Sequence, residues 1–273
     1  MAPLKLLTPE QKEFYERNGF IQLSDVFTDE EFEEIHREYN ALFQRKENEQ
    51  NSNLEGVWQG TEMQKASKGL QISVKSIHNL QMHSGVFTRL LLHQKFLDAL
   101  EDVVGSPNIL LHHTKAHIKP PEKGAPFLMH QDYHYFPHRN HTMVAAFIHM
   151  EDTNPENGGL CVYPGSHKLG PLPEKEVMGD NGSLYRHIDQ EQFPLDKATP
   201  VIARKGDLLI FSYLLVHGSY LNLSKRSRPM FLAQIRAAED EPTKEIHRSY
   251  CQDMVLRGVN EKMPAIITER HVK

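Results

Sequence analysis

The sequence has little cysteine, with only Cys161 and Cys251 among 273 residues. Two cysteines that lie far apart in the chain cannot build a disulfide framework or a cysteine-rich zinc site. Positive charge is also in the minority, because 31 Lys and Arg stand against 36 Asp and Glu and leave a net charge of −5. This balance argues against a surface devoted to nucleic acid. We therefore expect no nucleic-acid partner.

Long apolar runs are missing as well. No stretch approaches the length that is needed to cross a bilayer. The first twenty residues turn charged within a dozen positions and lack the apolar centre of a signal peptide. Residues 270–273 read Arg-His-Val-Lys, which is neither a prenylation box nor a peroxisomal Ser-Lys-Leu ending. We expect a cytoplasmic protein without a membrane span, and the peroxisome stays open as an alternative.

The order of the secondary-structure signals predicts helices first and strands later. Cap residues precede apolar positions at helical spacing in residues 8–19, 28–43 and about 84–104. Short apolar or alternating runs typical of strands follow the last of these helices, separated by Gly, Pro and Asn. These runs are residues 108–118, 143–150, 159–163, 207–215 and 230–237.

This order favours an α+β protein with a mainly β core, an antiparallel sandwich or barrel supported by N-terminal helices. We expect a single domain spanning residues 1–273. Its parts would be a helical region of about residues 8–105, a β core of about residues 106–240 and a C-terminal extension of residues 241–273.

Histidine is abundant, with 17 in the chain and five of them between His130 and His149. In His130-Gln131-Asp132 the first and third side chains point to the same side of an extended segment. His217 follows the apolar run from Asp207, which predicts a buried strand whose end faces a pocket. Two imidazoles and one carboxylate on one face are the ligand pattern of non-haem Fe(II) oxygenases. His130, Asp132 and His217 are therefore the candidate metal ligands and catalytic centre.

An arginine follows this candidate ligand set at a useful distance along the chain. Arg228 lies eleven positions after His217, across a turn-rich segment that could lead into the next strand. A guanidinium binds a carboxylate through two parallel hydrogen bonds, so Arg228 could hold the far end of a 2-oxo dicarboxylate. Arg226 has the same parity as Arg228, so the residues alone leave the two as alternatives.

Four sequence blocks together resemble the phytanoyl-CoA hydroxylase (phytanoyl-CoA dioxygenase) family. They are residues 130–139 (HQDYHYFPHR), 156–167 (ENGGLCVYPGSH), 205–211 (KGDLLIF) and 217–219 (HGS) followed by Arg228. The resemblance covers about residues 8–237. It implies a double-stranded β-helix, a cupin-like jelly-roll barrel with helices on one side. It also implies an Fe(II)- and 2-oxoglutarate-dependent dioxygenase that uses O2, with ascorbate as reductant.

The same resemblance assigns roles to individual residues. It places the iron ligands on His130, Asp132 and His217, and the 2-oxoglutarate arginine on Arg228 rather than Arg226. Ser219 would assist Arg228, Lys75 would lie near the cosubstrate, and Phe147 stands where relatives have an aromatic residue, often tryptophan. Lys115 replaces an apolar residue that is common in relatives beside the cosubstrate, so it must find a carboxylate or point outward, because burying an unpaired lysine is costly.

The substrate is the least specified part of the hypothesis. His134 and Tyr135 are candidates to line its pocket, and we expect hydroxylation of an aliphatic carbon in a small-molecule or lipid-like, possibly acyl-CoA, substrate. The sequence does not indicate the oligomeric state. Two other functions fit a jelly-roll: a silent ligand-binding or sensor protein, and a cupin-type metal-dependent isomerase or hydrolase.

One alternative concerns the histidines themselves. His130, His134, His138 and His141 have the spacing of one helix face, which could form a zinc or copper site. Pro137 argues against this helix.

Overall fold

The computed structural model describes residues 3–49, 55–57, 73–178, 184–244 and 248–264. Its first helix, α1 (Pro9–Asn18), begins with a capping box in which Thr8 and Gln11 bond each other's backbone N–H. Gly19 ends this helix in the left-handed conformation, at φ 80°, where glycine carries no steric penalty. The chain then enters strand β1 (Phe20–Leu23).

The second helix, α2 (Asp29–Glu47), starts with a similar capping box between Thr28 and Glu31. Its buried side chains recur every three to four positions, so one face of the helix packs on the protein. Those side chains are Phe32, Ile35, Tyr39, Leu42 and Phe43.

The single helix predicted over about residues 84–104 is wrong in one respect, because the segment forms two helices. These are α4 (Gly85–Leu91) and α5 (Gln94–Val104), preceded by the short 3-10 turn η1 (Leu80–Met82). His93 adopts an extended conformation between them, at ψ 131°, and its imidazole accepts a hydrogen bond from the N–H of Phe96. Within α5, buried Asp102 accepts three backbone N–H groups from residues 5–7, each at 2.8 Å, and thereby anchors the N-terminal segment.

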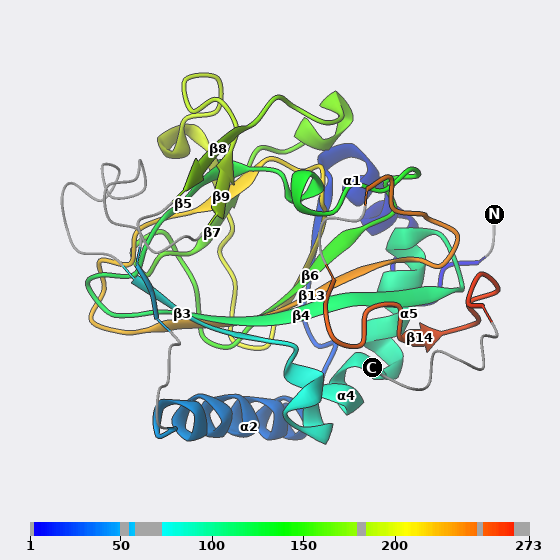
Figure 1. The fold of residues 1–273 in the computed structure, drawn as a ribbon, viewed down its shortest axis with the longest axis horizontal. Helices are drawn as coiled ribbons and strands as arrows, with labels where there is room; N and C mark the ends of the chain where they lie inside the picture. The colour runs from blue at the N-terminus through cyan, green and yellow to red at the C-terminus, as the bar shows by residue number, and fades with distance from the viewer. Residues whose placement is uncertain (1–2, 50–54, 58–72, 179–183, 245–247, 265–273) are drawn as a thin grey trace.

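The strands of the described residues form two main antiparallel sheets. The larger has the order β1-β11-β6-β13-β4-β3-β2, and β14 pairs with the start of β4. Figure 1 shows this sheet between helices α2, α4 and α5 and the smaller sheet. Besides β1, its strands are β2 (Glu55–Val57), β3 (Ser73–His78), β4 (Ile109–Lys119), β6 (Val144–His149), β11 (Leu208–Ser212), β13 (Arg228–Ala237) and β14 (Val255–Arg257).

The smaller sheet has the order β10-β7-β12-β5. A separate hairpin, β8-β9, and three further 3-10 turns complete the elements of the described chain. Their bounds are β5 (Phe127–His130), β7 (Leu160–Val162), β8 (Lys175–Met178), β9 (Leu184–His187), β10 (Thr199–Pro200), β12 (His217–Ser219), η2 (Asp132–Tyr135), η3 (Ser166–Leu169) and η4 (Leu195–Lys197).

The two faces of the larger sheet differ in chemistry, because side chains alternate along each strand. On β13, Phe231, Ala233 and Ile235 belong to the main hydrophobic core, which also contains the buried residues of the helices. Met230, Leu232 and Gln234 face the other way, toward the smaller sheet, and line a cavity between the two sheets. The helices therefore stabilise one face of the sheet and leave the other available for a binding site.

A β-bulge in β4 shifts this alternation by one residue. Gln234 of β13 pairs with His113, whereas the next residue, Ile235, pairs with Leu111, so His112 is the extra residue. Before the bulge the odd-numbered residues of β4 face the helices, as Leu111 does. After it, His113 and the odd-numbered residues that follow face the cavity.

The prediction of a mainly β core with supporting helices is confirmed, as are the strands expected at residues 108–118, 143–150 and 230–237, within one or two residues at each end. Among the described residues the strands form open sheets rather than one closed barrel, so the jelly-roll assignment stays a prediction at this point. No described helix combines the length and apolar character needed to cross a lipid bilayer.

Candidate metal centre and cosubstrate cavity

Two strands of the smaller sheet bring the candidate ligands together. His130 is the last residue of β5 and His217 the first of β12, and the two residues are paired in register. Asp132 follows after one extended residue, Gln131, and begins η2. Gln131 points the opposite way, where it is buried and bonds the backbone of Gly170, Leu172 and Leu214. The alternation expected for His130-Gln131-Asp132 is therefore present.

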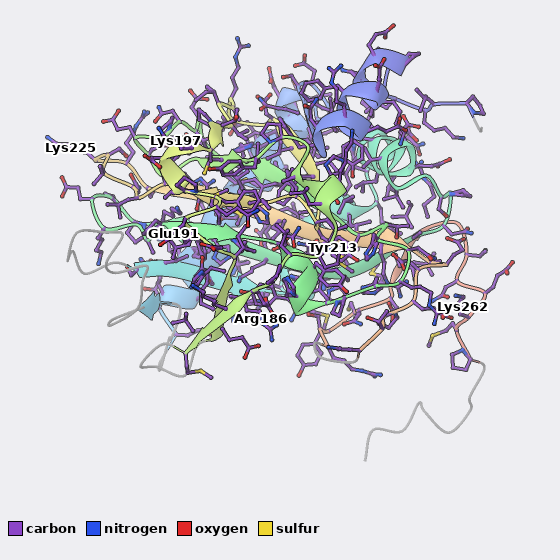
Figure 2. The ribbon with its side chains drawn as sticks, turned by 90° about the horizontal axis from the view of Figure 1, so that it is seen from above. Arg186, Glu191, Lys197, Tyr213, Lys225 and Lys262 are labelled. Atoms are coloured by element: carbon purple, nitrogen blue, oxygen red, sulfur yellow. The ribbon has the colours of Figure 1, made fainter. Side chains whose placement is uncertain are left out.

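The predicted single strand before His217 is wrong in its extent. β11 ends at Ser212, a turn covers residues 213–216, and His217 starts β12 in the other sheet. The chain thus passes from one sheet to the other within this apolar run, which is why every residue of it is buried. Tyr213 is buried at this turn, and its hydroxyl forms a hydrogen bond with His141 Nδ1 at 2.7 Å. Figure 2 shows Tyr213 inside the molecule, with Lys225 and Lys262 at opposite ends of it.

The three candidate ligands form one compact cluster. One ligand atom from each of His130, Asp132 and His217 lies within 4.8 Å of the others. The Asp132 Oδ1 atom is 3.8 Å from His130 Nε2 and 3.7 Å from His217 Nε2. Such separations suit three ligands around one ion better than direct hydrogen bonds.

Backbone and side-chain hydrogen bonds orient each of these groups. His130 Nδ1 donates to the carbonyl of Leu128 at 2.8 Å, and His217 Nδ1 donates to the carbonyl of Leu215 at 2.9 Å. Both imidazoles therefore keep Nε2 free as an electron-pair donor on the side of Asp132. Gln234 Nε2 donates to Asp132 Oδ2 at 2.6 Å, which holds the carboxylate in place.

Burial and the neighbouring His217 lower the pKa of His130 to about 4, so this imidazole is neutral at physiological pH. A metal ion requires the neutral form of a histidine ligand. The donor set of two imidazoles and one carboxylate fits Fe(II), and its clustering on one side would leave further coordination positions open.

The cluster opens into a cavity of about 210 Å³ between the two sheets. One end is deeply buried, and its residues Lys119, Ser219 and Arg228 are each less than 5% exposed. The other end reaches solvent near His78, which is exposed. The metal cluster lies in the wall of this same cavity.

The buried end is built to receive an anion. Arg228 is 2% exposed, and its Nε and Nη2 atoms have no hydrogen-bond partner among the described residues. Its guanidinium lies 5.2 Å from the ring centroid of Phe147. Lys119 Nζ donates to Ser219 Oγ at 2.7 Å and to the carbonyl of Tyr220 at 2.6 Å. Two buried donors without an acceptor are costly, and a carboxylate would satisfy both in one plane.

Comparison with known proteins identifies the family. The profile described as Phytanoyl-CoA dioxygenase matches residues 15–230 of this chain. The chain belongs to the phytanoyl-CoA dioxygenase family. The peroxisomal phytanoyl-CoA dioxygenase of Rattus norvegicus is 31% identical over 232 residues, which are 82% of this chain and 66% of the rat protein. The chain thus spans just under two thirds of the length of that relative.

More distant relatives of this chain are named for other activities. Ectoine dioxygenase of Bordetella bronchiseptica is 25% identical over 244 residues, 80% of this chain and 71% of that protein. Among solved structures, the epimerase SnoN in complex with Fe3+, alpha ketoglutarate and nogalamycin RO has a TM-score of 0.66 at 21% identity, and the match covers 86% of this chain and 85% of SnoN. The latter likeness shows a shared fold.

The residues that the family resemblance suggested do not all lie at the cavity. Phe147, Ser219 and Arg228 line it, and Arg226, the alternative to Arg228, is exposed before β13 begins. Lys75 is placed elsewhere: its ammonium pairs with Glu47 of α2 at 2.6 Å. The reason is strand alternation: residues three positions apart in a strand point to opposite faces. His78 faces the cavity, so Lys75 faces the helices.

Of the two candidate substrate residues, only Tyr135 lies at the cavity. Tyr135 lines the cavity, and its hydroxyl accepts a hydrogen bond from the N–H of Arg186 at 3.1 Å. His134 points away from the cavity, because its Nε2 donates to the carbonyl of Leu172 at 2.7 Å and its Nδ1 lies 3.5 Å from Glu174. The alternative histidine helix is not formed, since only residues 132–135 make a short 3-10 turn.

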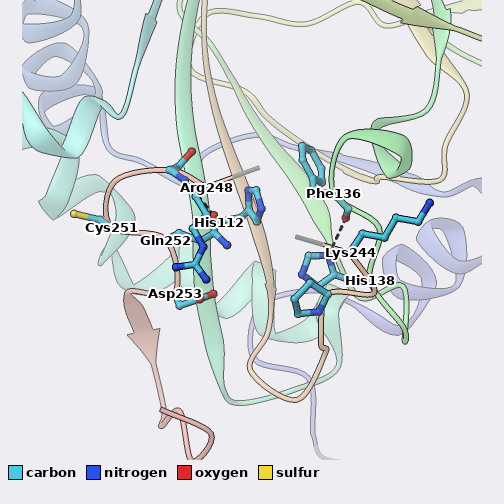
Figure 3. A pocket seen from close by; sticks show the side chains of 10 residues that line it. His112, Phe136, His138, Lys244, Arg248, Cys251, Gln252 and Asp253 are labelled. Carbon is cyan, nitrogen blue, oxygen red and sulfur yellow. Dashed lines mark hydrogen bonds between the residues drawn. The ribbon is translucent and has the colours of Figure 1, made fainter. Parts of the chain in front are cut away.

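A second cavity of about 220 Å³ lies beside the first (Figure 3). Phe136 lines both, and its ring lies 4.8 Å from the ring of His112 and 5.6 Å from that of His113, measured between centroids. His138 Nδ1 donates to the carbonyl of Phe136 at 2.8 Å, the contact drawn in Figure 3.

Sequence reasoning missed three residues of the main cavity or misjudged their position. Lys119 received no role from the sequence, yet it is 1% exposed beside Arg228. Gln234 forms a hydrogen bond with Asp132, and the only sequence feature that marked it was a polar side chain in a mostly apolar strand. Lys115 lines the cavity and so neither points outward nor forms a close ion pair with a described carboxylate. A polar residue in an otherwise buried strand was the available signal for all three.

Proposed function

We propose that this chain is an Fe(II)- and 2-oxoglutarate-dependent dioxygenase that hydroxylates an aliphatic carbon of a small-molecule or lipid-like substrate. His130, Asp132 and His217 would hold Fe(II), and Arg228 would bind the far carboxylate of 2-oxoglutarate. The proposal includes a double-stranded β-helix fold within a single domain, as the resemblance to the family implies.

One observation carries the proposal: the buried, unpartnered guanidinium of Arg228 lies in the same cavity as the His-Asp-His cluster. A metal site alone would suit a hydrolase or an isomerase of cupin type. Those reactions give a buried arginine without an acceptor no purpose, and its cost would then be uncompensated. A 2-oxo dicarboxylate accounts for both features, because its two ends need a metal and a carboxylate receptor.

When bound, Fe(II) would supply the activation of O2 and the oxidative decarboxylation of 2-oxoglutarate to succinate and CO2, coupled to hydroxylation. The protein's own residues bind, orient and exclude water. Lys119 and Ser219 extend the carboxylate receptor of Arg228, and Phe147 and Phe211 supply apolar walls that keep water out of the buried end. Gln234 keeps Asp132 facing the two imidazoles.

The test is succinate formation from 2-oxoglutarate by the full chain with Fe(II), O2 and ascorbate, in the presence of a panel of candidate substrates. Asp132→Ala should abolish succinate formation and lower the iron content, whereas Asp196→Ala, which removes an exposed carboxylate on η4, should leave both unchanged. Hydroxylation is read by mass spectrometry as the gain of one oxygen atom in the product.

Three results would contradict the proposal. Binding of Fe(II) and 2-oxoglutarate without succinate under any substrate would indicate a silent binding protein. Turnover that needs neither O2 nor 2-oxoglutarate would indicate a cupin-type isomerase or hydrolase. A product of unchanged mass that forms only with O2 and 2-oxoglutarate would support the proposed cosubstrates but refute hydroxylation as the reaction.

A further inference from the structure

The two polar ends of the Gln234 side-chain amide have different surroundings. Nε2 donates to Asp132 Oδ2 at 2.6 Å, whereas Oε1 has no hydrogen-bond partner among the described residues. The side chain lines the cavity and is only 1% exposed. A buried carbonyl oxygen without a donor is costly, so Oε1 needs a donor that the described part of the chain does not supply.

The contact with Asp132 decides which end of this amide is which. A carboxylate that binds a metal ion is ionised and can only accept hydrogen bonds. The group that faces it at 2.6 Å is therefore the NH2, and the oxygen points away from Asp132. Exchanging the two ends would place two oxygens against each other. The atom without a partner is thus an acceptor, and it needs an O–H or N–H group.

The cosubstrates of the proposed reaction cannot supply this group. 2-Oxoglutarate carries two carboxylates and a keto oxygen, and O2 carries no hydrogen, so neither can donate. The buried donors Lys119 and Arg228 pair with each other six residues along β4 and β13 from the pair of His113 and Gln234, ~20 Å away at ~3.3 Å per residue. Of the reactants in the proposed reaction, only the substrate can bring a donor to Gln234.

Apolar groups surround this position. Leu232 precedes Gln234 by two residues on the same face of β13 and lines the same cavity. The ring of Phe136 lies 5.6 Å from that of His113, the residue paired with Gln234. An alkyl chain can pack on Leu232 and Phe136, and the oxygen of Gln234 offers an acceptor between them and the metal cluster.

We propose that Gln234 Oε1 accepts a hydrogen bond from the substrate, so that the substrate class is an aliphatic molecule with a hydroxyl or amide N–H beside the carbon that is hydroxylated. The donor lies beside this carbon because the same amide contacts a metal ligand. This proposal rests on the proposed function, since it presumes that the metal cluster and Arg228 hold iron and 2-oxoglutarate. Gln234 acts as a specificity-determining residue, because an analogue without the donor leaves Oε1 unpaired in an apolar environment.

The experiment compares isomers that differ in this donor. The full chain is loaded anaerobically with Mn(II), which stands in for Fe(II), and with 2-oxoglutarate, so that no turnover occurs. Isothermal titration calorimetry follows hexan-1-ol and its isomer 1-methoxypentane, then N-methylpentanamide and its isomer N,N-dimethylbutanamide. In at least one pair we expect the isomer with the O–H or N–H to bind at least ~10 times more tightly. Comparison of the two pairs tells whether the site prefers a hydroxyl or an amide.

Paramagnetic relaxation of the probe's protons by Mn(II) locates the bound donor. The enhancement falls steeply with distance from the ion. Since Gln234 contacts a metal ligand, the protons next to the hydroxyl or amide group should relax faster than those at the far end of the alkyl chain.

Three variants separate the two ends of the amide. Gln234→Lys keeps a donor toward Asp132 and removes the acceptor, and Gln234→Met removes both while it fills similar space. Both variants should lose the preference for the isomer with the donor. The titrations use saturating Mn(II), so a change in metal affinity does not enter the comparison. Gln44→Met, at an exposed glutamine of α2, should bind all four probes like the unaltered protein.

The outcomes separate this proposal from the proposed function. Failure of the unaltered protein to bind Mn(II) and 2-oxoglutarate would refute the proposed function itself. Normal binding of both would refute only the role of Oε1 if no probe binds, if the isomers of each pair bind equally, or if the far end of the chain relaxes faster.

The variants can also overturn the inference. A preference that is lost in Gln234→Met but kept in Gln234→Lys would show that Gln234 acts only through Asp132, and a preference kept in both would assign the acceptor to another residue. A weaker affinity for 2-oxoglutarate in Gln234→Lys, in which Asp132 is still held, would place the amide at the cosubstrate instead.

Discussion

Arg228→Met should weaken 2-oxoglutarate binding and at the same time stabilise the protein without ligand. Hydrogen bonds to charged groups contribute ~1.5–3 kcal/mol each, so losing the two that Nε and Nη2 can make to a carboxylate costs about 3 kcal/mol or more. Since about 1.4 kcal/mol corresponds to a factor of ten, the affinity should fall at least ~100-fold. Methionine keeps the apolar stem and fills similar space.

The effect on stability has the opposite sign. Each buried donor without a partner costs ~1–3 kcal/mol, and Arg228 carries two of them. Methionine removes this cost and gives up the contact of the guanidinium with Phe147, which contributes about 0.5–2 kcal/mol. The free energy of unfolding of the ligand-free protein should therefore rise by about 1–3 kcal/mol.

Two measurements check this prediction: calorimetric titration of the Mn(II)-loaded protein with 2-oxoglutarate, and urea unfolding of the ligand-free protein. Arg226→Met is the matched control, because this exposed arginine lies two residues earlier and should change neither quantity. If Arg228→Met destabilises the ligand-free protein, or binds 2-oxoglutarate as tightly as before, the buried guanidinium is structural and the argument for a carboxylate receptor is wrong.

Two other perturbations test separate parts of the structure. Gln234→Leu should lower the affinity for Fe(II) by about 10- to 100-fold in equilibrium dialysis, because Asp132 loses the bond that orients it, and an unchanged affinity would show that Asp132 needs no such support. Asp102→Ala should lower the free energy of unfolding in urea by about 2–5 kcal/mol, because three backbone N–H groups lose their acceptor, while Mn(II) affinity stays the same.

The metal cluster was predictable from sequence because it depends on local geometry and on one apolar run. His130 and Asp132 share a side through alternation alone, and the burial of the segment before His217 was evident from its composition. Alternation could not predict where that segment passes from one sheet to the other, because nearly all of its residues are apolar and no alternating pattern changes along it. The passage from β11 to β12 is a tertiary feature.

The basic residues of the cavity were harder to predict for a different reason. Lys75 and Lys119 are both lysines in strands, and composition does not tell which one faces the cavity. That depends on the pairing of β3 with β4 and on the bulge at His112, neither of which leaves a sequence signal. Arg228 was separated from Arg226 only by resemblance, whereas in the structure the start of β13 makes the distinction.

The extra residue at His112 determines how this protein tolerates changes in chain length. Deleting His112 itself would restore strict alternation along β4 and leave Leu111 and the row from His113 to Lys119 facing as they do now, because the residues on either side of the deletion already point to opposite faces. Deleting Ala116 instead, with the bulge kept, would turn His117 and Lys119 toward the helices and the apolar core. Deletion of His112 should therefore damage the protein much less than deletion of Ala116, because only the second exchanges the two faces of a strand segment.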